Sequence, residues 1–227
     1  ITALITFTRT QQIMTSPVVV ARSVQFLGLL GFHTAVSQSA AISVNAKKQG
    51  EPLDVLTACL ASTSSSYPFF VQIRSLLLSV SGSGSFNSVV TSIEKASFCC
   101  PAYLTLTGAG KGEGVILTKR RETTGSVNPL WLDCNNETAP QGWRGVVTNY
   151  DYWTKSPAYD DRQHVASEAL DSMGQGSDLK AIVQMLQTTL SLRGNNITAG
   201  PLNPLTLFTS ILSVNDTTIQ TTNHLKT

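Results

Sequence analysis

The feature that most constrains the fold is a change of hydrophobic periodicity that recurs along the chain. Short runs rich in Val, Ile, Thr and Phe, typical of β-strands, alternate with stretches whose apolar residues recur every three or four positions, typical of helices. Strands are predicted over 1–8, 13–21, 24–32, 41–45, 103–107, 114–119, 130–133, 145–148, 205–214 and 217–221. Two groups of strands separated by helices, without a long linker, predict one layered α+β domain over residues 1–227.

Five stretches are predicted to be helical. A first helix begins near Pro52, and a second covers 69–77 and ends before a short Ser/Gly connection. Ser85 is a natural N-cap for the third helix. The fourth covers 162–173, and the fifth begins at the cap Ser177. The apolar faces expected for the third and fifth helices are Phe86, Val89, Val90 and Ile93, and Leu179, Ile182, Val183, Leu186 and Leu190.

Charge is scarce in this chain. Asp, Glu, Lys and Arg make up 13% of 227 residues, about half the usual ~25%. The formal net charge of +2 is small and scattered, so we expect no nucleic-acid partner, which would require a clustered basic stripe. The one tight basic run, 119–121, is followed at once by Glu122. We interpret this run as a solvated strand end rather than as a phosphate or anionic-lipid contact.

The compartment is indicated by glycosylation motifs. Asn136, Asn196 and Asn215 each begin an Asn-x-Thr triplet, the acceptor pattern for N-linked sugar. Three acceptors in a short chain favour the secretory pathway and predict a secreted or lysosomal protein. No run reaches the roughly 20 apolar residues of a transmembrane helix. The sequence begins with Ile1, inside a predicted strand and without a signal-peptide pattern, so we expect a processed chain or a fragment.

Metal and cofactor chemistry has no support in the sequence. The spacing of Cys59, Cys99, Cys100 and Cys134 fits no zinc pattern, and adjacent Cys99 and Cys100 would point to opposite faces of a strand. We therefore expect these two to be buried thiols that do not pair with each other. The three histidines, His33, His164 and His224, are far apart in sequence and form no metal motif. We predict neither a metal site nor a cofactor.

The glycine-rich stretch 108–112 resembles a phosphate-binding loop only superficially. Such a loop needs a Gly six positions before its Lys and a Ser or Thr directly after it. Thr105 and Gly112 occupy those positions, and a strand rather than a helix follows. A hairpin turn is the better interpretation.

The segment richest in chemical information runs from Gly112 to Arg162. A predicted strand runs into Thr148-Asn149-Tyr150-Asp151-Tyr152-Trp153, which places an amide side chain beside aromatic residues. A neutral amide N–H can stabilise a developing negative charge without bringing a counter-charge. On the residues alone, an Asn149 that merely caps a strand in an aromatic corner remains the alternative.

Four motifs follow one another in this half of the chain: Glu113-Gly114-Val115-Ile116-Leu117-Thr118-Lys119-Arg120, Leu130-Trp131-Leu132-Asp133, Thr148-Asn149-Tyr150-Asp151-Tyr152-Trp153 and Asp160-Asp161-Arg162. Their order resembles that in the family of acid ceramidase and the N-acylethanolamine-hydrolysing acid amidase. Similarity extends upstream to 26–34 and downstream to 205–209, so it spans nearly the whole chain.

The resemblance implies an N-terminal-nucleophile hydrolase with an αββα sandwich that cleaves lipid amides without a cofactor. In that family an N-terminal Cys attacks the amide carbonyl, and its own α-amino group is the base. By resemblance, Asn149 is expected to donate to the oxyanion and Arg162 to support the wall of the site. The expected partners are a fatty-acyl amide lipid, an upstream chain or pro-segment of the same precursor, and a membrane surface in peripheral contact.

The chain departs from the family pattern at two positions. Ile1 has no nucleophilic atom, and the Cys-bearing segment of the family would precede it, so we expect this chain alone to be inactive. Ala46 stands where our alignment places an acidic residue that assists self-cleavage. Three interpretations remain: an incomplete record of an active enzyme, an inactive lipid-binding or structural glycoprotein, and an unrelated α+β glycoprotein.

Overall fold

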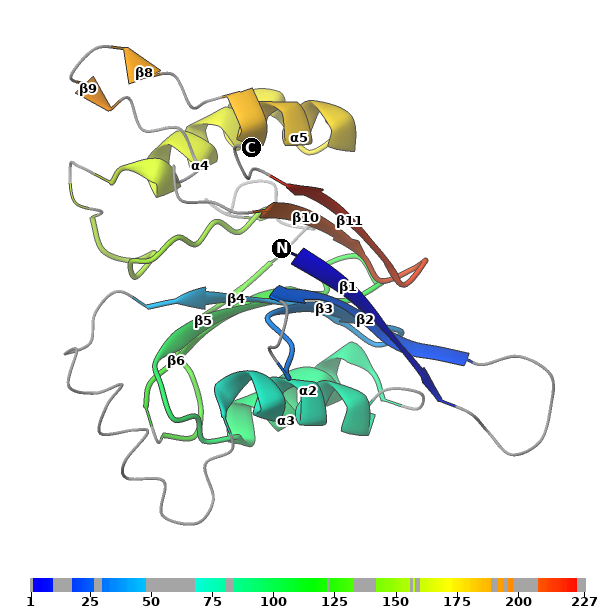
Figure 1. Ribbon diagram of the computed structural model, residues 1–227. Coiled ribbons are helices and arrows are strands. Elements are labelled where there is room, and N and C mark those ends of the chain that lie inside the picture. Colours follow the sequence, from blue (N-terminus) through cyan, green and yellow to red (C-terminus); the bar gives the residue numbers. More distant parts are fainter. Residues whose placement is uncertain are drawn as a thin grey trace.

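The molecule is built in four layers, helix, sheet, sheet and helix (Figure 1). The computed structural model describes residues 2–9, 18–26, 30–47, 68–80, 84–121, 123–132, 142–155, 157, 160–188, 192–193, 196–197 and 208–223. Helices α2 (Phe69–Val80) and α3 (Phe86–Lys95) cover one face of a seven-stranded sheet. The hairpin of β10 (Phe208–Ser213) and β11 (Thr218–Asn223) lies on the other face. Helices α4 (Arg162–Met173) and α5 (Leu179–Thr188) lie beyond the hairpin. The expected αββα order of layers is confirmed, whereas its extent over all of 1–227 stays a prediction.

The large sheet is an antiparallel meander in which every strand pairs with its neighbours in sequence. Its strands are β1 (Thr2–Arg9), β2 (Val18–Phe26), β3 (Thr34–Ser37), β4 (Ala41–Ala46), β5 (Ala102–Thr107), β6 (Gly114–Lys119) and β7 (Val127–Trp131). A short pair, β8 (Leu192–Arg193) and β9 (Asn196–Ile197), lies apart from it. Strands β4, β5 and β6 match the prediction to within a residue.

The strand predicted over 24–32 is wrong at its end, because residues 30–32 lie in no strand. Its first residues end β2, and Gly31 instead approaches the next layer so closely that a Cβ there would overlap the backbone of Phe70. Phe32 N–H donates to the Phe70 carbonyl at 2.9 Å, which fixes this contact. The chain then enters β3, a four-residue strand that was not predicted because it is too short for a periodic signal.

The helices α2 and α3 bury the faces that their periodicity indicates. Phe69, Ile73 and Leu77 of α2 are buried. The predicted face of α3, Phe86, Val89, Val90 and Ile93, is buried as well, and Ser85 accepts a hydrogen bond from Ser88 N–H as a helix N-cap. Both faces pack on the alternate residues of β4, β5 and β6 that point toward them. The helix predicted near Pro52 lies outside the described residues.

The far end of the chain corrects two details of the prediction. Helix α4 has its predicted bounds, but Ser177 does not cap α5, because its hydroxyl donates to the Met173 carbonyl at 2.6 Å. The Asp178 carbonyl accepts the first intrahelical bond, from Ile182 N–H. Leu179, expected on the buried face, is 54% exposed because it lies in the first turn of α5.

The basic run 119–121 is also corrected. Lys119 is not a solvated strand end: its side chain points into the α2–α3 layer and is 0% exposed. Its Nζ donates to the carbonyls of Glu94 and Gly125, both at 2.8 Å, and lies 5.5 Å from the Phe98 ring centroid. Burial lowers the Lys119 pKa to about 8. Side chains alternate between the two faces of a strand, so Lys119 points to the same face as Leu117, toward the core. The run of charged residues at 119–121 had indicated an exposed position instead.

The glycine-rich stretch 108–112 forms the predicted hairpin turn between β5 and β6. Gly108 N–H donates to the Glu113 carbonyl at 2.8 Å, and Gly112 adopts φ of 81°. Cys99 and Cys100 lie half-buried against the α2–α3 core, without a disulfide between them. Cys59 and Cys134 lie outside the described residues. Among the helices that the structure describes, none could cross a membrane.

Candidate functional site

The segment 142–155 crosses the molecule between the end of β4 and the start of α4. The strand predicted at 145–148 is wrong, because these residues have no strand pairing. Strand β5 pairs with β4 along its whole length on one side, whereas β3 pairs with it only as far as Ser43 on the other, and the segment forms no backbone ladder with the rest of that edge. It is held by side chains instead: Asn45 Nδ2 donates to the Val147 carbonyl at 3.4 Å.

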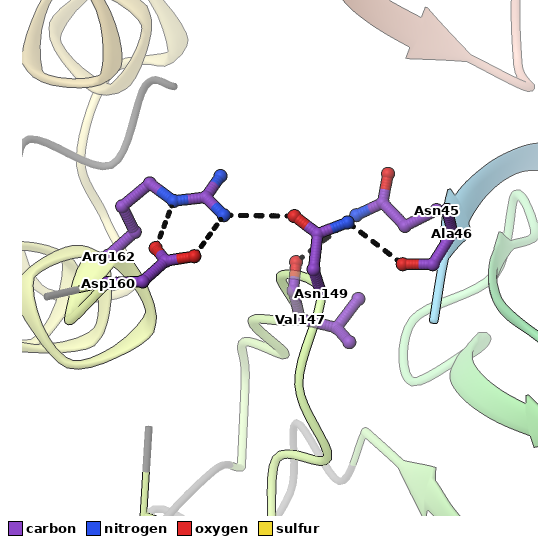
Figure 2. Close-up of polar contacts among 6 residues, drawn as sticks. All are labelled: Asn45, Ala46, Val147, Asn149, Asp160 and Arg162. Carbon is purple, nitrogen blue, oxygen red and sulfur yellow. Dashed lines mark hydrogen bonds and ion pairs between the residues drawn. The ribbon is translucent and has the colours of Figure 1, made fainter. Parts of the chain in front are cut away.

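Asn149 is held between β4 and α4 (Figure 2). Its Nδ2 donates to the Ala46 carbonyl at 2.8 Å, and its Oδ1 accepts from Nη2 of Arg162 at 2.9 Å. A carbonyl can only accept and a guanidinium can only donate, so the two partners determine which end of the amide carries nitrogen. Residues at positions 46, 149 and 162 thus meet at one point although they are far apart in sequence.

Arg162 is itself held by an acidic neighbour. Its Nε and Nη2 both contact the carboxylate of Asp160, with Nη2 at 2.9 Å from Oδ2, and both side chains are 13% exposed. A two-pronged Arg–carboxylate pair has a defined geometry. The pair therefore presents Nη2 to Asn149 in a defined direction.

The Asn149 side chain keeps one N–H group that can donate a further hydrogen bond. The side-chain amide has two N–H groups, of which one points at Ala46. Within the described part of the chain, no second acceptor contacts Nδ2. Because the Arg162 bond draws electron density toward Oδ1, it makes the remaining N–H a stronger donor. A half-buried, polarised N–H is suited to a developing oxyanion.

A second polar group adjoins Asn149 and was not predicted from the sequence. Asp151, 7% exposed, accepts from Nζ of Lys47 and from the Tyr103 hydroxyl, the latter at 2.7 Å. Burial, followed by the hydrogen bond to Asp151, raises the pKa of Tyr103. The signal available in the sequence was weak: Lys47 follows Ala46, and Asp151 lies two residues after Asn149.

The segment is also anchored at its start. Arg144, buried, contacts both carboxylate oxygens of Asp171 on α4, with Nε at 2.7 Å from Oδ1. This hydrogen bond lowers the Asp171 pKa. Residues 144, 149 and 151 thus attach one stretch of irregular chain to two different layers.

The histidines do not assemble a site in the described part of the chain. His33 is packed 5.4 Å from the Phe70 ring, its Nδ1 lies 3.2 Å from Thr34 Oγ1, and burial lowers its pKa. His164 is exposed and pairs with Glu168 on the next turn of α4, at 3.1 Å. No cluster of metal-ligating side chains occurs among the residues described. His224 and Ile1 lie outside them.

The three predicted glycosylation sites lie 13, 47 and 66 positions from Asn149 in sequence. Asn215 is exposed in the turn between β10 and β11, and Asn196 begins the short strand β9. Asn136 lies outside the described residues. Glycosylation at the three sites stays a prediction.

Comparison with known proteins gives a consistent set of relatives. No protein-family model matches the chain. It is 31% identical over 163 residues to the mouse N-acylethanolamine-hydrolyzing acid amidase, covering 71% of this chain and 42% of the relative. The Caenorhabditis elegans protein of that name is 28% identical over 173 residues, covering 75% and 42%. Rat acid ceramidase is 26% identical over 198 residues, covering 86% and 45%. The chain thus spans somewhat less than half the length of these relatives.

A solved structure shows the same fold. The Caenorhabditis elegans N-acylethanolamine-hydrolyzing acid amidase ortholog superposes with a TM-score of 0.70 over 95% of this chain and 81% of that one. The sequence identity is 23%, so the likeness shows the fold alone. The predicted fold of an N-terminal-nucleophile hydrolase is confirmed.

Proposed function

Because this chain belongs to the family of acid ceramidase and the N-acylethanolamine-hydrolysing acid amidase, we propose that it forms the oxyanion-binding part of a lipid-amide hydrolase. The substrate would be the amide bond of a fatty-acyl amide, an N-acylethanolamine or a ceramide. The nucleophile would be the thiol of an N-terminal Cys in a segment of the precursor upstream of Ile1.

The observation that carries the proposal is the environment of Asn149. Its amide is fixed at both ends, by Ala46 and by Arg162, and has one N–H to spare among the described contacts. An amide that only capped a strand would need the first contact and not the second. Residues 145–148 form no strand, and the strand end that the amide contacts is that of β4, so the second contact, with Arg162, is what supports the proposal over a strand cap.

In the proposed reaction the thiolate forms a bond to the amide carbonyl carbon, and the carbonyl π electrons move onto oxygen. Asn149 Nδ2–H donates to this oxyanion, which is a stronger acceptor than the ground-state carbonyl. The oxyanion then collapses, the C–N bond breaks, and the amine leaves with a proton from the α-ammonium group. Water later releases the fatty acid from the thioester.

The test begins with the native protein. N-terminal sequencing and intact mass identify the chain that precedes or pairs with Ile1, and the assay measures fatty acid released from an N-acylethanolamine and from a ceramide at acid pH. We expect release from protein that carries a Cys-initiated chain. Absence of release from such protein, with both substrates, would overturn the proposal.

Asn149→Ala tests the role of the amide itself. Loss of one oxyanion donor costs on the order of 10²–10³ in kcat, and we expect a much smaller change in KM. Asn87→Ala, a substitution of the same type on the exposed face of α3, is the matched control. Equal kcat values in the two variants would remove Asn149 from the mechanism.

A second function is favoured by one observation. Position 46, where the alignment expects an acidic residue that assists self-cleavage, is Ala46, which contributes only its carbonyl to the site. An inactive member of the family would bind acyl amides without cleaving them, as a secreted or lysosomal glycoprotein. Saturable binding of a fluorescent acyl amide by the Cys-bearing protein, recovered unhydrolysed, would favour this function.

A further inference from the structure

A buried ion pair lies directly beside Asn149. Ala46 and Lys47, consecutive at the end of β4, contact Asn149 and Asp151, which are two apart on the crossing segment. The two contacts are parallel: backbone carbonyl to amide, and ammonium to carboxylate. One contact alone would leave the segment free to rotate about it. Two contacts in succession determine both the distance of the segment from β4 and its rotation.

A third group fixes the carboxylate. The hydroxyl of Tyr103 donates to Oδ1 of Asp151 at 2.7 Å, the same oxygen that Lys47 contacts. Tyr103 is fully buried on β5 and pairs with Asn45 across the β4–β5 ladder. Asp151 is therefore attached to β5 and to the residue that directly follows β4, and β4 and β5 are adjacent strands of the seven-stranded sheet.

Two aromatic rings enclose the ammonium group. Lys47 Nζ lies 5.5 Å from the Tyr103 ring centroid and 5.7 Å from that of Trp153. The side chains of Lys47 and Asp151 are each 9% exposed, whereas Trp153 is 38% exposed and forms the outer side. A lysine with a carboxylate and two ring faces has its charge compensated although it is largely removed from water. Because this pair is largely shielded from water, it holds its two side chains in a defined orientation, which a solvated surface pair does not.

We propose that Lys47 and Asp151, with Tyr103, are positioning residues that set the place and direction of the Asn149 amide. The inference rests on the proposed function in assigning Asn149 to an oxyanion. Residues 145–148 have no ladder to hold them, so side-chain contacts must supply the positional precision that a strand would otherwise give. A donor works only when it lies within hydrogen-bond distance of the oxyanion, and a displacement of about 1 Å can cost about 10²-fold in rate.

The test uses the full native protein and three variants of the pair. Lys47→Met removes the ammonium and keeps the length of the side chain. Asp151→Asn removes the charge and keeps an oxygen for Tyr103, so it serves if Lys47→Met fails to fold. Lys47→Arg restores a cation. The first readout does not need activity: the ¹⁵N-resolved side-chain NH₂ signals of Asn149, assigned by their loss in Asn149→Ala.

We expect both Lys47→Met and Asp151→Asn to move the two Asn149 amide protons toward each other and to speed their exchange with water. Lys47→Arg should leave them close to the wild type. In an active preparation, kcat should fall about 10- to 100-fold in the first two variants with little change in KM, and recover in Lys47→Arg. Ile73→Val, a core change in α2 on the opposite face of the sheet, controls for lost stability.

The outcomes separate the two proposals. Asn149 signals unchanged in a folded Lys47→Met or Asp151→Asn variant would overturn the positioning role, whatever the activity. A kcat loss in Ile73→Val equal to that in the pair variants would do the same, because stability alone would then explain it. Shifted Asn149 signals in a protein that hydrolyses no lipid amide would uphold the positioning role and refute the proposed function.

Discussion

Arg162 donates from Nη2 to Oδ1 of Asn149 at 2.9 Å, and this contact turns the amide nitrogen toward β4. The bond joins the first residue of α4 to a segment that makes no strand pairing. Without it, the amide could rotate and present oxygen, an acceptor, where a donor is required. The direction of the Asn149 dipole therefore depends on a residue from another layer.

We predict that Arg162→Lys impairs the proposed reaction more than it impairs folding. A lysine cannot contact Asp160 through two nitrogens and Asn149 at the same time, since its ammonium is a single point of charge. We expect kcat to fall about tenfold or more and the free energy of unfolding to fall by about 1 kcal/mol. Steady-state kinetics and urea unfolding check this. His164→Gln, in the same helix turn but exposed, should change neither quantity measurably.

A second prediction concerns Lys119 and pH. Its pKa is about 8 in the folded protein and 10.5 in the reference state, so between these values the unfolded chain binds more protons. The contribution of Lys119 to the free energy of unfolding therefore rises as pH increases from 8 toward 10.5, by at most about 1.4 kcal/mol per pH unit. Below pH 8 Lys119 is charged in the folded protein, so the full free-energy cost of burying its charge lowers the stability.

Lys119→Met removes this titration. The difference in unfolding free energy between wild type and variant, measured in urea at several values from pH 7.5 to 9.5, should shift in favour of the wild type as pH rises. Other groups titrate equally in both proteins and cancel in the difference. Parallel pH profiles would show that Lys119 retains its ordinary pKa.

Gly31→Ala is predicted to destabilise the protein by about 2 kcal/mol, in the range of overpacked cores. The new Cβ would overlap backbone atoms of Phe70, which cannot move aside as a flexible side chain would. Gly176→Ala is the matched control, because its Cβ would have no neighbour within 4 Å. Thermal or urea unfolding of the two variants should differ clearly, and equal midpoints would contradict the close approach.

A fourth prediction concerns sugar. Asn215 is exposed in the β10–β11 turn, where an enzyme of the secretory pathway could reach it. Expression in a secreting eukaryotic host should give a chain that loses mass on enzymatic removal of N-glycans. Asn215→Gln should remove one glycan from the pattern, whereas a mass that is unchanged by the substitution would show that the site is not used.

Much of the fold follows from local sequence. The start and buried face of α3 and the bounds of strands β4 to β6 were predicted nearly to the residue, because α3 shows a clear helical period after a chemically specific cap at Ser85 and the strands are short apolar runs. The hairpin turn at 108–112 followed from glycine in the same way. These elements are decided by interactions within a few residues, which the sequence displays directly.

The sequence alone determined the layered α+β class, the family motif at 148–153 and the candidacy of Asn149. Tertiary structure alone decided that residues 145–148 lie outside any ladder, that Lys119 points inward, and that Lys47 meets Asp151 across 104 positions of sequence. The reason is physical: periodicity reports which face of an element is apolar. It carries no information about which distant element supplies the partner of a buried charge.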